Sequence, residues 1–155
     1  MNVRVDDRRW MWALPFAILA VILLSFATYQ WVIPRTNLEI RTVYHESPGG
    51  GGTGGTLNVN VLFTNKGNRE ISDLKATITV TEVGQGIRER YSLDPRGVDT
   101  RKNIEVKITF IGSQYETYRI SMELSFECNG NSYAQTLDYV TVEDVMNLVY
   151  VENIR

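Results

Sequence analysis

The chain has 155 residues, of which 43% are hydrophobic and 22% charged, and its formal net charge is −2. Once the apolar stretch near the N-terminus is set aside, this length accommodates one domain of ordinary size and leaves no room for a second. From residue 10 onward, 13 basic residues are interleaved with 16 acidic ones, as in Arg88-Glu89-Arg90. Nucleic-acid binding requires basic side chains gathered on one face. We therefore expect a protein or glycan partner and no nucleic acid.

The N-terminal segment combines a short basic tail with a long uncharged run. Arg4, Arg8 and Arg9 precede residues 10–33, which carry no formal charge. A helix of that length, at about 1.5 Å per residue, is long enough to cross a bilayer. The sequence predicts a cytoplasmic tail over residues 1–9 and a transmembrane signal-anchor helix over residues 10–33. The three arginines orient it with the N-terminus in the cytoplasm and the C-terminal domain outside the cell membrane.

Aromatic residues mark both ends of this uncharged run. Trp10 and Trp12 lie at its start, and Tyr29 and Trp31 lie at its end. Indole and phenol rings favour the headgroup layer because one part is apolar and another forms hydrogen bonds. We predict that these four residues are membrane-interface anchors, and that lipid is the partner of the segment.

Signal cleavage is the alternative for the same segment. Ser25-Phe26-Ala27 places small residues at the two positions that a signal peptidase reads, so cleavage after Ala27 would release a soluble binding module. The apolar run continues past Ala27 to Ile33 with a second set of aromatic residues, which a signal peptide does not need. The sequence favours retention of the anchor.

Residues 34–56 form a juxtamembrane segment with a glycine-rich stretch from Pro48 to Thr56. A phosphate-binding loop would need a lysine followed by Ser or Thr and then a helix, whereas Leu57 begins an alternating strand pattern. The stretch is therefore predicted to be a flexible loop or linker. If residues 38–44 form the first strand of the domain, the glycines connect two strands. If they do not, the glycines are a hinge on a stalk.

Residues 57–155 are predicted to fold as an all-β domain. Apolar and polar residues alternate over 57–63, 74–80, 104–110 and 118–128, which is typical of strands with one buried face. The last of these is the longest and is predicted to be a central strand. Weaker strands are expected at 38–44, 87–93 and 133–142, which brings the total to about seven and favours an antiparallel β-sandwich of two sheets.

Turn residues separate these predicted strands. Glycine and asparagine tolerate positive φ, so turns are expected where they cluster. The expected turns are Asn65–Asn68, Val83–Gly86, Asp94–Gly97 and Asn129–Asn131.

Three of these runs carry a resemblance to a known family. Asn65-Lys66-Gly67, then Asp94-Pro95-Arg96-Gly97 within a Leu-x-Pro-x-Gly pattern, then the strand 104–110, resemble CARDB-type immunoglobulin-like domains of prokaryotic surface proteins. The resemblance covers residues 57–142. It implies an immunoglobulin-like sandwich with a role in adhesion or surface architecture, and no shared catalytic site. By architecture alone, one N-terminal helix followed by such a domain also resembles the archaellum stator-type proteins of archaea, whose β-sandwich engages the surface layer.

The chemistry-bearing residues predict neither catalysis nor a cofactor nor a metal site. His45 and Cys128 are the single histidine and the single cysteine, so a cluster of nucleophile and base or of metal ligands has few candidates. Cys128 is predicted to be a small buried hydrophobe at the end of a strand. The acidic pair Asp94 and Asp99, and the acidic group around residues 138–144, lack a calcium-ligand spacing. We expect the protein not to be an enzyme.

The C-terminal stretch 145–155 is too apolar for a free tail, with Leu148, Tyr150 and Ile154 among its apolar residues. It is predicted either to complete the sandwich as a last strand or to pair with a neighbouring subunit by strand addition, which makes these three residues candidates for partner docking. The chain is thus predicted to be a non-catalytic, membrane-anchored cell-envelope protein. Its outward β-sandwich would mediate contact with another envelope protein or with itself. Alternatives are an accessory subunit of a membrane complex and the secreted module released after Ala27.

Overall fold

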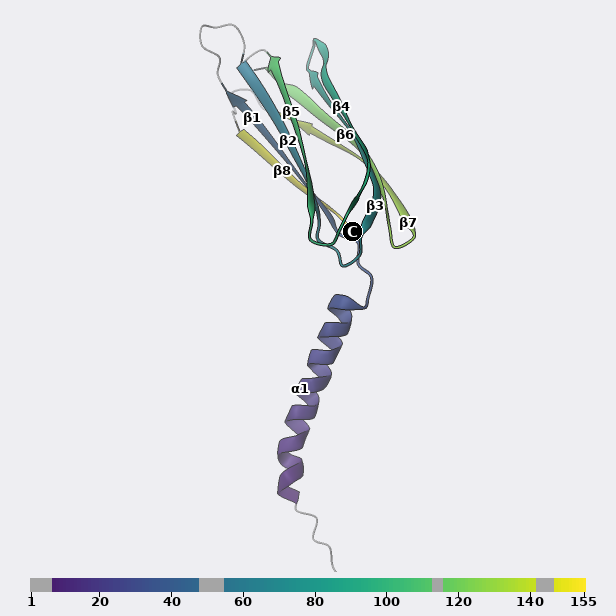
Figure 1. Ribbon diagram of the computed structural model, residues 1–155. Coiled ribbons are helices and arrows are strands. Elements are labelled where there is room, and N and C mark those ends of the chain that lie inside the picture. The colour runs from purple at the N-terminus through teal and green to yellow at the C-terminus, as the bar shows by residue number, and fades with distance from the viewer. Residues whose placement is uncertain (1–6, 48–54, 113–115, 142–146) are drawn as a thin grey trace, which may run out of the picture. The chain divides into compact units, whose positions relative to one another are not determined.

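A computed structural model describes residues 7–47, 55–112, 116–141 and 147–155 and divides the chain into two compact units, Met1–Pro34 and Arg35–Arg155. Helix α1, Asp7–Trp31, forms the first unit (Figure 1). Strands form the second unit, which contains the hydrophobic core.

Helix α1 is apolar on all sides over its described side chains. Ten large apolar side chains between Leu14 and Tyr29 are each 52–69% exposed. The hydroxyl of Thr28 donates a hydrogen bond to the carbonyl oxygen of Leu24 at 2.8 Å, which satisfies this polar group within the helix. Among the described residues, no helix combines the length and the apolarity that a membrane crossing requires. The transmembrane assignment of residues 10–33 rests on the sequence and stays a prediction.

In the described part of the second unit, eight strands form two four-stranded antiparallel sheets. The strands are β1 Leu38–Ser47, β2 Gly55–Asn65, β3 Ile71–Glu82, β4 Gly86–Val98, β5 Asn103–Gly112, β6 Tyr118–Cys128, β7 Asn131–Val140 and β8 Asn147–Ile154. The first sheet has the order β5-β2-β1-β8, and the second has the order β4-β3-β6-β7 (Figure 1). The predicted all-β sandwich is confirmed, with one strand more than the seven expected. Strand β6 lies between β3 and β7, so its predicted central position is confirmed.

Strand β1 answers the open question about residues 38–44. It pairs with β2 from Leu38↔Asn65 to Ser47↔Thr56 and with β8 on its other side. Its inward residues are buried and alternate with more exposed ones, as a strand with one face in the core requires. The sandwich therefore includes residues before 57, and the glycine-rich stretch follows β1 in the sequence and ends inside β2, at Gly55 and Thr56. Residues 48–54 of that stretch lie outside the described residues.

Two predicted turns had opposite outcomes. Asn129 and Gly130 have φ values of 52° and 76° and join β6 to β7 as a two-residue hairpin loop, which confirms the Asn-Gly turn. The turn predicted at Asp94–Gly97 is wrong, because these residues continue β4. β4 is an edge strand, where the missing N–H of Pro95 is tolerated. The register shifts there, from the pair Leu74↔Arg96 to the pair Ala76↔Leu93, and so accommodates an extra residue.

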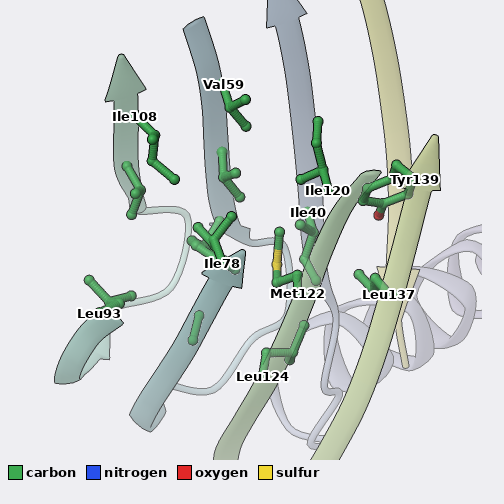
Figure 2. Close-up of a cluster of buried hydrophobic side chains, with 14 of the residues drawn as sticks. Ile40, Val59, Ile78, Leu93, Ile108, Ile120, Met122, Leu124, Leu137 and Tyr139 are labelled. Atoms are coloured by element: carbon green, nitrogen blue, oxygen red, sulfur yellow. The ribbon is translucent and has the colours of Figure 1, made fainter. Parts of the chain in front are cut away.

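The hydrophobic core lies between the two sheets. Figure 2 shows Ile40, Val59 and Ile108 of the first sheet together with Ile78 and Met122 of the second. Full burial of one such side chain stabilises the fold by about 1.5–3 kcal/mol. At the end of β6, Cys128 is a buried free cysteine, as predicted.

Candidate interaction surface

The predicted docking residues lie on β8, with their side chains used inside the chain. Ile154 is buried in the core, and Leu148 packs against the core. The ring of Tyr150 stacks on that of Tyr139 with centroids 4.5 Å apart, and its hydroxyl donates to the carbonyl oxygen of Val140 at 2.6 Å. The C-terminal stretch thus completes the first sheet as its last strand. The outward side chains of β8 and its edge that faces away from β1 remain available for contact with another molecule.

The outward side chains of β8 include two valines that the sequence analysis did not single out. Val149 and Val151 are each 50% exposed. Val149 lies directly beside Val43 of β1, and Val151 lies beside Arg41. We call Val43, Val149 and Val151 the valine strip. The valine strip was predictable from the sequence. Successive side chains of a strand point to opposite faces, so residues 149 and 151 point away from the face that carries Leu148, Tyr150 and Ile154.

The edge strands differ in how they are protected against pairing with another chain. Proline, charges and register shifts discourage such pairing. β4 contains Pro95 and register shifts, and β5 presents the ion pair between Lys107 and Glu105 at 3.4 Å. β8 has Glu152 as its single charge and no proline, and it pairs with β1 without a register shift. Of the two edges of the first sheet, β8 is the less protected.

Asn65 is fully buried and forms hydrogen bonds to the turn that follows it, to the end of β4 and to the residue before β5. Its Nδ2 group donates to the carbonyl oxygens of Arg69 and Val98 at 2.8 and 2.9 Å, and its Oδ1 atom accepts from the backbone N–H of Gly67 at 2.9 Å. Its backbone N–H also donates to the carbonyl oxygen of Lys102. This asparagine, quoted above for the family resemblance, therefore has a structural role that requires both ends of its amide group.

Residues 65–68, which we call the clamp turn, hold the start of the domain. The backbone N–H of Lys66 donates to the carbonyl oxygen of Asn37 at 2.8 Å, and that of Arg35 donates to Oδ1 of Asn68 at 2.8 Å. Lys66 also forms an ion pair with Glu39. A Cβ atom at position 67 would collide with the carbonyl oxygen of Arg35, so only glycine fits there. The clamp turn fixes the place where the chain from the first unit enters the sandwich.

His45 belongs to a hydrogen-bonded chain on the outer face of the first sheet. Its Nδ1 atom lies 2.6 Å from Oδ1 of Asn147, and its Nε2 atom lies 3.1 Å from the hydroxyl of Ser47. The chain of hydrogen bonds therefore ties β8 to β1. His45 also lines a groove of about 210 Å³, together with Asn58 and Lys107.

A second groove crosses the outer face of the other sheet. It has a volume of about 450 Å³ and lies over β3, β6 and β7, with Lys75, Glu123 and Gln135 among its lining residues. Small-molecule sites are mostly apolar with a few polar groups, whereas this lining is mainly polar. No group of His, Cys, Asp and Glu within the described ranges is placed to hold a metal ion.

The remaining predicted site residues belong to the first unit. The side chain of Tyr29 is 52% exposed near the end of α1. The side chains of Trp10, Trp12 and Trp31, and those of Arg4, Arg8 and Arg9, lie outside the described residues.

Buried tyrosines make the sandwich sensitive to alkali. Burial raises the pKa of Tyr139 from 10.0 to about 12, and the carboxylate of Glu152 adds to the effect. Burial also raises the pKa of Tyr44 above its usual range, together with the nearby carboxylate of Glu46, whose Oε2 atom accepts a hydrogen bond from the Tyr44 hydroxyl at 3.3 Å.

We expect the free energy of unfolding to fall as the pH rises from about 10 to about 12. In that interval the unfolded chain loses the Tyr139 proton and the folded chain keeps it, so unfolding becomes more favourable. Urea unfolding at a series of pH values measures this. The variant Tyr139→Phe should show a smaller decrease over the interval, and an unchanged slope would contradict the assignment.

Comparisons with known proteins assign no family to this chain. No family model and no curated protein matches the sequence. Among solved structures, a Northeast Structural Genomics Consortium target designated SoR45 is similar over 69% of this chain and 86% of its own length, with 6% identity and a TM-score of 0.46. The function of the second unit therefore has to be argued from its own residues.

Proposed function

We propose that this chain is a non-catalytic, membrane-anchored cell-envelope protein whose immunoglobulin-like sandwich mediates protein–protein interaction outside the membrane. The observation that carries the interaction role is β8, an edge strand with one charge beside an exposed valine strip. An exposed edge of this kind is a template for a strand from another chain.

The membrane anchor is supported by the chemistry of the first unit. Residues 10–33 carry no formal charge, and the described apolar side chains of α1 lie on all sides and are exposed. A helix that is apolar all round needs an apolar environment to cover it, which lipid provides. The arginines at positions 4, 8 and 9 favour a cytoplasmic N-terminus.

The immunoglobulin-like assignment is supported by the strand order. The first sheet places β1, β2 and β5 side by side, and the second places β3, β6 and β7 side by side. In immunoglobulin sandwiches the first, second and fifth strands share one sheet and the third, sixth and seventh share the other. Two strands depart from the seven-strand plan: β4 lies beside β3 in the second sheet and not beside β5, and β8 is an addition beside β1.

Two steps test this proposal on the full-length chain. The first is alkaline washing of native membranes, after which an intact chain with residues 1–33 should stay in the membrane fraction. The second is purification in mild detergent, with mass spectrometry of co-purifying proteins and of the N-terminus. A stoichiometric partner, including a second copy, is the expected result. A mature chain that begins at Thr28 in the medium would favour the secreted module and overturn the anchor.

A matched pair of variants separates anchoring from folding. Replacing Ile22 and Leu23 with arginine places two charges near the middle of residues 10–33, each costing about 2.5–3.5 kcal/mol in a membrane helix. This variant should leave the membrane fraction. Replacing the same two residues with alanine is the control and should remain there. Equal membrane retention of both variants would contradict a spanning helix.

A further inference from the structure

Strand β8 is complementary to itself. In an antiparallel pair formed by two copies of the same strand, residues opposite each other have numbers with a constant sum. With Tyr150 on the twofold axis, seven of the eight residues of β8 find a partner. The opposed pairs are Tyr150 with Tyr150, Val149 with Val151, Asn147 with Asn153, and Leu148 with Glu152.

This register matches the polarity of the outer face and avoids opposed charges. On the outer face, valine meets valine and asparagine meets asparagine, so side chains of the same kind become cross-strand neighbours. The single charged residue of β8, Glu152, meets Leu148 and not its own copy, so no like charges oppose each other.

Neighbouring registers are worse. A shift must change the sum by two, because a change of one would place opposed side chains on different faces of the sheet. A register centred on Val149 places Asn147 opposite Val151. A register centred on Val151 places Tyr150 opposite Glu152 and Val149 opposite Asn153. Both place an asparagine opposite a valine on the outer face, whereas the register centred on Tyr150 keeps the valines together and has Leu148 opposite Glu152 as its one kind of mixed pair.

We infer that β8 is the edge through which two copies of this chain pair, antiparallel and with Tyr150 on the twofold axis. The inference deepens the proposed function, on which it rests, by naming the partner of that edge. The first sheets of the two copies become one continuous eight-stranded sheet, in the order β5-β2-β1-β8 followed by β8-β1-β2-β5 of the second copy. Symmetric pairing of this type uses the same patch on both subunits. It brings the two valine strips together across the new strand pair.

The register is tested by cysteine cross-linking of the full-length chain in mild detergent. Val149→Cys and Val151→Cys are made separately, and one carries an affinity tag. Directly opposed residues have Cβ atoms about 4.5–5.5 Å apart, so a thiol cross-linker of one-carbon reach should join the two variants when they are mixed. Each variant alone should cross-link several-fold less. The wild-type chain is the control, since its Cys128 is buried. Equal cross-linking of the mixture and of the single variants would overturn the register.

The interface itself is tested by charge. The double variant Val149→Lys and Val151→Lys should convert a dimer into a monomer in native mass spectrometry, with an unchanged unfolding temperature because both side chains point outward. Ile111→Lys is the matched control on β5, the other edge strand of the same sheet, where the residue is 81% exposed. This variant should stay dimeric. A dimer that survives both lysines at β8, or a wild-type chain that is monomeric, overturns the inference.

The same experiments distinguish a wrong partner for β8 from a wrong proposed function. If the wild-type chain is monomeric but a different envelope protein co-purifies in stoichiometric amount, self-pairing is wrong and the interaction role stands. If the chain leaves the membrane on alkaline washing, the anchored role is wrong whatever the oligomeric state.

Discussion

Replacement of Asn65 by alanine is expected to lower the free energy of unfolding by about 3 kcal/mol or more. The side chain is fully buried and makes three hydrogen bonds, to the carbonyl oxygens of Arg69 and Val98 and from the N–H of Gly67. Its removal leaves the buried carbonyl oxygen of Val98 and the buried N–H of Gly67 without that partner, and each buried polar group left unsatisfied costs about 1–3 kcal/mol. Urea unfolding of the full-length chain in mild detergent measures the change.

Two controls make this result specific. Asn103→Ala changes the same residue type at an exposed position on β5 and should shift the free energy of unfolding by less than about 0.5 kcal/mol. Limited proteolysis should show faster tryptic cleavage after Arg35 in the Asn65 variant, because the clamp turn bonds directly to Arg35 and Asn37. Equal stability of the two variants would show that the clamp turn does not depend on Asn65.

The second large effect is expected from Phe126→Ala in the central strand β6. Phe126 is 2% exposed and stacks on Tyr133 with ring centroids 4.8 Å apart. Truncation of a buried phenylalanine to alanine typically costs about 3–5 kcal/mol, from lost burial and the cavity left behind. The hydroxyl of Tyr133 in turn donates to Thr36 Oγ1 at 3.1 Å, so the effect reaches the start of the domain.

The control for Phe126 is Tyr91→Ala on the edge strand β4, where the side chain is 38% exposed. Its cost should be well below that of Phe126→Ala in the same urea experiment. A double variant of Phe126 and Tyr133, both changed to alanine, should cost less than the sum of the single changes because the two rings contact each other. A loss below about 1 kcal/mol for Phe126→Ala would contradict its place in the core.

The start of the domain, residues 35–37, lies near the residues whose replacement is predicted to have the largest effects. The clamp turn and the Tyr133 hydroxyl bind residues 35–37 to the body of the sandwich. β8 is also paired to β1, which begins at Leu38 opposite Ile154. A second copy paired at β8 would therefore attach to the strand next to β1.

The local sequence pattern was enough to predict the strands that have one apolar and one polar face. β2, β5 and β6 have apolar residues at every second position, and the period of two identifies both the strand and its buried face. The Asn129-Gly130 turn was also predictable, because an asparagine and a glycine with positive φ fit a two-residue hairpin loop.

The turn expected at Asp94–Gly97 shows where local pattern fails. Proline and glycine indicate a turn by their backbone preferences, but on an edge strand the missing N–H faces no partner and a register shift accommodates the extra residue. Whether a strand lies at an edge depends on the order of strands in the sheet. That order is not encoded in any short run of residues.

The alternation of apolar residues predicted an all-β sandwich with a central strand at 118–128 and a buried cysteine at its end, because such strands remove their apolar face from water by packing against another sheet. Only the tertiary structure decided which apolar residues of the C-terminal stretch serve the fold. Leu148, Tyr150 and Ile154 turn inward, and Val149 and Val151 remain on the surface. The physical reason is that burial depends on which strand pairs with β1 and in what register, and such long-range pairing follows from the packing of the whole domain.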